Sequence, residues 1–234
     1  MNKQYDVIIV GAGPMGIFTA YELMNKCPEK KVLVIEQGHD IYSRKCPILM
    51  KKISKCPKNK KGESGCYPSC SLTSGFGGSG AYSDGKFNIT SEFGGWMTDY
   101  LSDEVVLDLI KYVDSINLAH GAPNEVTNPY TKEVLDIEKR GIAKGLKLLR
   151  SEVRHLGTEV NLQVLKNIYE ELKQHMDFAF LTKVKDVIVD DDTVKGVILE
   201  DDTEIKAEYV VLGIGRCGAD WLCKTLSSHN VSFT

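Results

Sequence analysis

Three glycines, spaced as Gly11-Ala-Gly13-Pro-Met-Gly16, stand between an apolar run from Tyr5 to Val10 and a helical pattern that begins at about Pro14. A second apolar run follows from Lys31 to Glu36, which predicts a strand, a helix and a second strand. In such a unit Gly11 permits a tight turn, Gly13 lets a pyrophosphate approach the backbone, and Gly16 lets the helix pack closely on the strand. The N-terminus of the helix supplies free N–H groups. We therefore expect an α/β fold of the Rossmann type with a dinucleotide site, in which Pro14 and Met15 complete the turn.

Glu36 lies 20 residues after Gly16, at the end of the second predicted strand. A carboxylate at this place accepts hydrogen bonds from both ribose hydroxyls of a bound dinucleotide. No arginine follows Glu36 directly, and a 2′-phosphate would meet the carboxylate unfavourably. The adenosine should therefore carry a free 2′-hydroxyl, as in FAD or NAD rather than NADP.

Composition excludes several classes of protein. The 234 residues are 42% hydrophobic and 26% charged, which is typical of a globular protein with a sizeable core. A net charge of −3 gives no basic field, so we expect no nucleic-acid partner. No apolar run approaches the ~18 residues of a membrane span, so we expect no membrane partner. Seven cysteines without a secretory signal favour reduced thiols and a cytoplasmic location. Nothing in the sequence indicates the oligomeric state.

The rest of the chain divides by pattern. A basic stretch from Ile41 to Gly62 and a Gly/Ser-rich stretch from Gly62 to Gly85 lack regular periodicity. Helical periodicity then returns after Ser102, a candidate N-cap, and continues over about Ile137–Leu156 and Val160–Met176. We therefore predict a dinucleotide-binding domain of residues 1–93 and 177–234, interrupted by a helical insertion of residues 94–176.

From Phe178 onward the pattern predicts short strands, and the middle ones should form a β-meander. The predicted strands are Phe178–Leu181, Val184–Val189, Val194–Leu199, Glu204–Ala207 and Tyr209–Leu212. The expected fold is thus a three-layer α/β domain with a parallel sheet, a meander and the helical insertion.

Four cysteines lie within the irregular basic segment, at Cys46, Cys56, Cys66 and Cys70. Four thiols could ligate zinc or an iron–sulfur cluster, although their spacing matches no standard signature. A redox-active thiol pair and inert thiols are the other interpretations. Cys217 and Cys223 are expected to be packing residues.

The second half of the chain resembles flavoproteins of the glutathione-reductase-like FAD/NAD(P)-binding superfamily. Its strand and glycine turn, Tyr209-Val-Val-Leu-Gly213-Ile-Gly215-Arg, look like the turn of that superfamily, with Gly213 where alanine is usual. More specifically, the chain resembles an uncharacterised bacterial family of FAD-dependent dehydrogenases. The segments that carry this resemblance are Ser74-Gly-Phe-Gly-Gly-Ser-Gly-Ala-Tyr-Ser-Asp-Gly-Lys86, Arg154-His-Leu-Gly-Thr158 and Gly213-Ile-Gly-Arg-Cys-Gly-Ala-Asp-Trp221.

The resemblance implies an FAD-dependent oxidoreductase in which hydride passes through a bound flavin. Gly11, Gly13 and Gly16 would then hold the FAD pyrophosphate and Glu36 its ribose. The backbone of Val184 would meet the adenine edge. The remaining residues that the resemblance brings toward the cofactor are Gly77, Gly78, Ser79, Gly80, Gly213, Gly215 and Arg216. A small-molecule substrate and NAD(P)H are the partners that it implies.

Two residues are candidates for catalysis. Lys86 could place positive charge near the flavin and stabilise its reduced form. The alternative for Lys86 is an exposed lysine after a turn. His155 could transfer a proton, whereas a histidine at the C-terminal end of a predicted helix could also simply complement the helix dipole.

Domains of this superfamily close with a further parallel strand and a Gly-Asp motif, which is not evident before Thr234. We therefore expect a domain that is incomplete at its C-terminus or is completed by another polypeptide. Two other functions stay open. One is a thiazole-synthase-like protein that uses NAD. The other is a non-catalytic subunit that binds a nucleotide or a metal.

Overall fold

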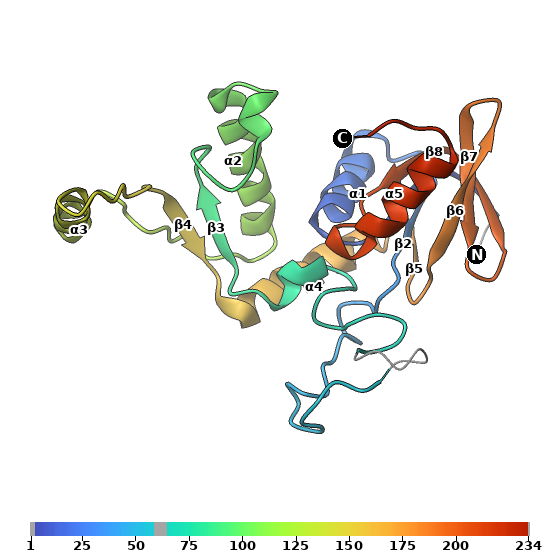
Figure 1. Ribbon diagram of the computed structural model, residues 1–234, viewed down its shortest axis with the longest axis horizontal. Coiled ribbons are helices and arrows are strands. Elements are labelled where there is room, and N and C mark those ends of the chain that lie inside the picture. The colour runs from blue at the N-terminus through green and yellow to red at the C-terminus, as the bar shows by residue number, and fades with distance from the viewer. Residues whose placement is uncertain (1–2, 59–64, 234) are drawn as a thin grey trace. The chain divides into compact units, whose positions relative to one another are not determined.

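The computed structural model describes residues 3–58 and 65–233, and the chain divides into two compact units. The first comprises residues 1–82 and 165–234, and the second comprises residues 83–164 (Figure 1). The sequence predicted an insertion of residues 94–176. Compared with that insertion, the second unit begins earlier, just before a strand that starts at Lys86. It also ends earlier, inside a helix.

The first unit is built on one six-stranded mixed sheet with the order β5-β2-β1-β8-β7-β6 (Figure 1). β1, β2, β5 and β8 run parallel, and β6, β7 and the start of β8 form an antiparallel meander. The strands are β1 (Gln4–Val10), β2 (Val32–Ile35), β5 (Asp177–Ala179), β6 (Val184–Asp190), β7 (Thr193–Leu199) and β8 (Glu204–Leu212). The predicted α/β fold with a β-meander is confirmed.

Val7–Val10 of β1 and Val32–Ile35 of β2 are continuous apolar runs that are buried on both faces of the sheet. Gly16 of α1 (Pro14–Lys26) lies against Ile9, so the helix covers one face. The opposite face, which carries Ile8 and Leu33, shares one hydrophobic cluster with Val197 and Ile205 of the meander. Helix, parallel sheet and meander therefore form the three expected layers.

β8 differs from the prediction of two strands, Glu204–Ala207 and Tyr209–Leu212. It is one continuous strand, because it pairs first with β7 and then with β1. Val7 of β1 pairs with Tyr209, and Val10 pairs with Leu212. Two partners of different direction hold the backbone extended through Glu208, so no turn forms there.

The second unit is not purely helical. It contains α2 (Asp103–Ala119), α3 (Lys132–Ile142) and a two-stranded antiparallel sheet of β3 (Lys86–Ile89) and β4 (Glu152–His155). Ser102 caps α2 as predicted, with its hydroxyl accepting a hydrogen bond from the N–H of Val105. The expected helix over Ile137–Leu156 is wrong, because α3 ends at Ile142 and the chain then becomes extended to pair with β3.

The described residues form further helices. They are α4 (Gly157–Leu172), α5 (Ala219–Ser228) and the short 3-10 helices η1 (Gly78–Tyr82), η2 (Met97–Asp99) and η3 (Arg216–Gly218). Among residues 3–58 and 65–233, none of the helices is long and apolar enough to cross a membrane.

Candidate functional site

A cavity of about 770 Å³ lies at the carboxyl ends of β1 and β8 in the first unit. Open α/β sheets bind ligands at this edge, and the volume is within the usual range for ligand pockets, roughly 300–1,000 Å³. Ten of the residues singled out in the sequence line it: Gly11, Gly13, Pro14, Met15, Glu36, Gly78, Ser79, Gly213, Gly215 and Arg216. Chain segments distant in sequence therefore meet at one site.

Four other sequence candidates are not among the lining residues of this cavity. Gly16 lies beneath the turn, and Gly77 donates its backbone N–H to the carbonyl of Ala12 at 2.8 Å. Gly80 lies inside η1. The side chain of Val184 is buried in the hydrophobic cluster of the sheet, where β6 pairs with β7.

The three fingerprint glycines have different neighbours. A Cβ on Gly16 would lie 1.9 Å from the carbonyl oxygen of Gly11, and a Cβ on Gly11 would lie 2.4 Å from that of Gly213. Both glycines are therefore required for the chain to pack. A Cβ on Gly13 would find its nearest neighbour, the Cα of Gly78, at 4.0 Å. Gly13 thus faces open space in the cavity.

The N-terminus of α1 is available to an anion. Gly13 is the N-cap, Pro14 is the first helical residue, and no side chain caps this end. The first N–H groups of a helix lack partners within the helix and carry a partial positive charge. The bare backbone of Gly13 leaves room for a phosphate to approach them.

Glu36 has a second role that the sequence did not indicate. Its side chain is only 6% exposed, and its carboxylate accepts three backbone N–H groups. Oε2 accepts from Ala12 at 2.9 Å, while Oε1 accepts from Gly38 at 2.8 Å and from Gly75 at 2.9 Å. Because a carboxylate has about four acceptor positions, these bonds leave one, on Oε2, for a ribose hydroxyl.

One wall of the cavity was missed by the sequence analysis. Thr73, Ser74 and Gly75 line it, together with Gln37, which directly follows Glu36. Ser74 and Gly75 begin a segment that carries the family resemblance, but neither they nor Thr73 were expected to line the site. The signal that could have revealed the wall is the Gly/Ser-rich composition after Gly62, because such a segment can bring bare backbone close to a ligand.

His155 is not at the end of a helix, so the expectation of a dipole-complementing histidine is wrong. It is the last residue of β4 and lies opposite Lys86 of β3. Asp84 joins the two: its Oδ2 lies 2.7 Å from Lys86 Nζ and 3.0 Å from His155 Nε2. Hydrogen bonds from Lys86 and then His155 lower the pKa of Asp84 to about 2. The second unit thus gathers both catalytic candidates around one carboxylate.

Among the residues that the structure describes, the cysteines are not gathered into a metal centre. Cys46 is buried, Cys56 is exposed, and Cys66 and Cys70 are partly buried. Within residues 3–58 and 65–233, no group of three or more His, Cys, Asp or Glu side chains is arranged to hold a metal ion. The structure therefore does not support the zinc or iron–sulfur candidates.

The thiols nevertheless have different environments. Burial raises the pKa of the Cys66 thiol. At Cys70 burial acts in the same direction, but hydrogen bonds from Leu72 and Thr73 and the positive charge of Arg44 outweigh it and lower the pKa. Cys217 and Cys223 are exposed, so the expectation that they pack in a core is wrong. Cys217 lines the cavity beside Arg216.

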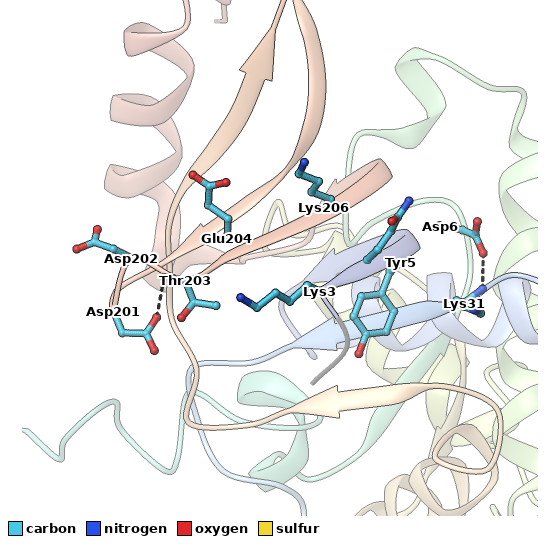
Figure 2. A pocket seen from close by; sticks show the side chains of 10 residues that line it. Lys3, Tyr5, Asp6, Lys31, Asp201, Asp202, Thr203, Glu204 and Lys206 are labelled. Atoms are coloured by element: carbon cyan, nitrogen blue, oxygen red, sulfur yellow. Dashed lines mark hydrogen bonds between the residues drawn. The ribbon is translucent and has the colours of Figure 1, made fainter.

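A second open cavity, of about 1020 Å³, lies where β1 and β8 begin (Figure 2). Figure 2 shows side chains of both charges around it, among them Lys3, Lys31, Asp202 and Glu204. Its hydrogen bonds join neighbours in the wall, as between the N–H of Thr203 and Asp201. It lies at the opposite end of the strands from the fingerprint glycines and contains none of the predicted site residues.

No family model matches this chain. One curated protein, the FAD-containing monooxygenase EthA of Mycolicibacterium smegmatis, is 44% identical over 41 residues. The match covers 18% of this chain and 8% of the monooxygenase. It is too short to show the family.

Solved structures share the fold at low sequence identity. Glycine oxidase from Geobacillus kaustophilus gives a TM-score of 0.51 at 18% identity, over 99% of this chain and 60% of the oxidase. The 3-ketosteroid-delta4-(5alpha)-dehydrogenase of Rhodococcus jostii gives 0.52 at 13% identity, over 90% and 46%. Glycine oxidase from Bacillus cereus gives 0.50 at 14% identity, over 96% and 58%.

The chain thus spans between 46% and 60% of the length of these structures. Identities this low establish the architecture and not the reaction. The α/β fold of this chain is shared with two oxidases and a dehydrogenase.

Proposed function

We propose that this chain binds FAD in the cavity at the carboxyl ends of β1 and β8, and that it forms part of an FAD-dependent oxidoreductase. The observation that carries the proposal is the open space at Gly13, at an uncapped helix N-terminus, with a buried acid at the end of β2. FAD supplies hydride transfer when it is bound, so the chemistry of substrate oxidation belongs to the flavin.

The residues of the chain bind and orient the cofactor in this proposal. Gly11, Gly13 and Met15 would surround the pyrophosphate at the N-terminus of α1. Glu36 has one acceptor position left for one ribose hydroxyl. The neighbouring Gln37 could bond to the second ribose hydroxyl. Ser79 and Arg216 line the rest of the cavity.

The substrate is a small molecule in this proposal, and NAD(P)H is a candidate electron donor. Both partners, like the cytoplasmic location, rest on the resemblance of the sequence and on its composition. The 41-residue likeness to an FAD-containing monooxygenase favours FAD over NAD as the resident dinucleotide.

The test is a titration of the purified chain, freed of bound cofactor, with FAD, followed by quenching of flavin fluorescence. Saturable binding with one FAD per chain is expected, and ADP-ribose should compete for the site. The matched probe is 2′-phospho-ADP-ribose, which should compete at least about tenfold less well because its phosphate meets the buried Glu36 carboxylate. Saturable binding of NAD without binding of FAD would contradict the proposal.

A further inference from the structure

Arg44 is a buried cation that bonds to backbone carbonyl groups. Its side chain is only 3% exposed. Nε donates to Ser71 at 3.0 Å and Nη2 to Leu72 at 3.0 Å. Nη1 donates to Phe76 at 2.7 Å and to Gly78 at 2.8 Å. One guanidinium group therefore fixes four carbonyls of a single segment, residues 71–78, which we call the glycine loop.

The aromatic ring of Tyr82 covers this cation. The guanidinium carbon of Arg44 lies 5.1 Å from the centre of the ring, and the Tyr82 hydroxyl donates to the carbonyl oxygen of Arg44. Burial lowers the pKa of Arg44 from its usual value, whereas Tyr82 and Glu36 act in the opposite direction. An arginine stays charged even when buried. The guanidinium group is thus held by contacts on several sides.

The glycine loop lies between two opposite charges. Its N–H at Gly75 donates to the Glu36 carboxylate, while its carbonyls at Phe76 and Gly78 accept from Arg44. Peptide groups have one donor and one acceptor pointing in opposite directions, so two buried charges can fix their orientation. Glu36 therefore orients the peptide group between Ser74 and Gly75, and Arg44 orients the peptide groups that follow Phe76 and Gly78.

The same loop forms the wall opposite the fingerprint turn. Gly77 donates to the carbonyl of Ala12, and a Cβ on Gly78 would lie 3.2 Å from the Cα of Gly13. Gly78 is thus placed directly against the glycine at which a pyrophosphate would approach. Gly78 lines the cavity, whereas Arg44 is not among the lining residues, so the carbonyl oxygen of Gly78 is held by a group outside the wall.

We propose that Arg44 is a positioning residue of the dinucleotide site: it holds the carbonyl oxygens of Phe76 and Gly78 away from the cavity and fixes Gly78 against Gly13. A carbonyl oxygen turned toward a pyrophosphate would repel it, so a loop released from Arg44 binds the cofactor less well. This inference rests on the proposed function, because it assigns Arg44 to the FAD site.

The experiment compares FAD binding by the wild-type chain and by the variants Arg44→Ala, Arg44→Lys and Lys45→Ala. Lys45 is the exposed neighbour, so Lys45→Ala removes the same charge beside the loop and is the matched control. Arg44→Ala should weaken FAD binding by at least about tenfold, which corresponds to roughly 1.4 kcal/mol. Lys45→Ala should bind as the wild type does.

Rescue by a small guanidinium compound separates positioning from general destabilisation. Arg44→Ala leaves a cavity the size of the lost side chain, so millimolar ethylguanidinium should restore FAD affinity, while equimolar ethylammonium and urea should not. Arg44→Lys keeps the charge but lacks the planar fork that reaches several carbonyls. It should fold, bind with intermediate affinity, and serve in place of Arg44→Ala if the alanine variant does not fold.

The two proposals fail in different ways. If the wild-type chain does not bind FAD, the proposed function fails. If the wild type binds FAD and the folded Arg44 variants bind it equally well, the proposed function stands and the role of Arg44 is overturned. Weak binding that ethylguanidinium leaves unchanged also overturns the positioning role, provided that hydrogen exchange at the Gly75 and Gly77 amides is the same in the variant and the wild type.

Discussion

Lys86 and His155 lie directly opposite each other on β3 and β4, and both contact the same oxygen of Asp84. All three side chains are about half exposed. The sequence singled out Lys86 and His155 separately, as a candidate charge near a flavin and a candidate proton donor. The structure adds Asp84, whose carboxylate can orient both groups, as carboxylates orient catalytic histidines elsewhere.

Lys86→Met should raise the pKa of Asp84 from about 2 toward its usual value, because the hydrogen bond from Lys86 contributes most to the shift. His155→Gln should raise it less, and Lys86→Arg, which keeps the charge, should leave it low. Carboxyl carbon chemical shifts followed by NMR as a function of pH measure the change. Equal titration of Asp84 in the wild type and in Lys86→Met would contradict the assignment.

Asp84 also contributes a pH dependence to stability. Its pKa in the folded chain is lower than in the unfolded chain, so its ion pairs stabilise the fold above about pH 4. This contribution falls as the pH drops below about 4 and is lost as the pH passes through about 2. The difference in urea unfolding between the wild type and Asp84→Asn should therefore be largest near neutral pH and should vanish only below about pH 2.

Gly13→Val should leave the protein folded and reduce FAD affinity by about a hundredfold, since a branched side chain would occupy the path of the pyrophosphate. Its nearest protein neighbour is 4.0 Å away, so the free energy of unfolding should change by less than about 1 kcal/mol. Fluorescence titration and urea unfolding give the two numbers. Retained stoichiometric FAD in Gly13→Val would refute this site assignment.

Gly16→Ala should behave in the opposite way. Its Cβ would lie 1.9 Å from the carbonyl oxygen of Gly11, so the backbone must shift and stability should fall by at least about 2 kcal/mol. The loss should be visible in urea unfolding without any cofactor. A variant as stable as the wild type would show that helix and strand can separate at this point.

Glu36→Gln should destabilise the chain even in the absence of FAD. The glutamine amide group would place N–H donors against one of the three backbone N–H groups that the carboxylate now accepts. Leaving such a buried donor unpaired costs about 1–3 kcal/mol. Thermal and urea unfolding measure the loss, and Glu29→Gln at an exposed position is the control that should stay within about 0.5 kcal/mol.

Cys217 should react with maleimide more slowly when FAD is bound, because it is exposed and lines the cavity. About tenfold protection is expected where a bound ligand covers a pocket wall. Cys223 and Cys56 are exposed but do not line the cavity, so their labelling should not change. Mass spectrometry of labelled peptides distinguishes the three sites. Equal labelling of Cys217 with and without FAD would remove it from the site.

The elements with strong local signals were predicted well. Pro14 begins α1 and Lys26 ends it, because proline favours the first helical position and lysine the last turn. The serine cap of α2 is equally local. β1 and β2 followed from their apolar runs, and the meander followed from short β runs separated by turns.

The failures occur where distant residues decide the structure. Arg154 lies in β4 because its guanidinium group pairs with the buried Asp114 of α2, at 2.7 Å. No local sequence pattern predicts this ion pair. Because Arg154 is buried, its neighbour His155 is exposed on the other side of the strand. His155 therefore lies in a strand and not in a helix. β8 continues through Glu208 because β1 holds it.

The residues of the candidate site also fall into two groups, those with a local sequence signal and those without one. Gly11, Gly13, Gly16 and Glu36 could be found from spacing alone. Arg44 and the loop that it holds could not be found in this way. The four partners of Arg44 lie between 27 and 34 residues away, and they are backbone carbonyl groups, which every residue type has.

The close contact between Gly11 and Gly213 has a consequence for synthesis on the ribosome. The fingerprint turn is translated about 200 residues before Gly213 and the strand that carries it. Until then, β1 lacks its parallel neighbour on that side, and the cavity lacks the wall from Leu212 to Leu222. The cavity proposed to hold FAD is therefore complete only once β8 and the segment that follows it have been synthesised.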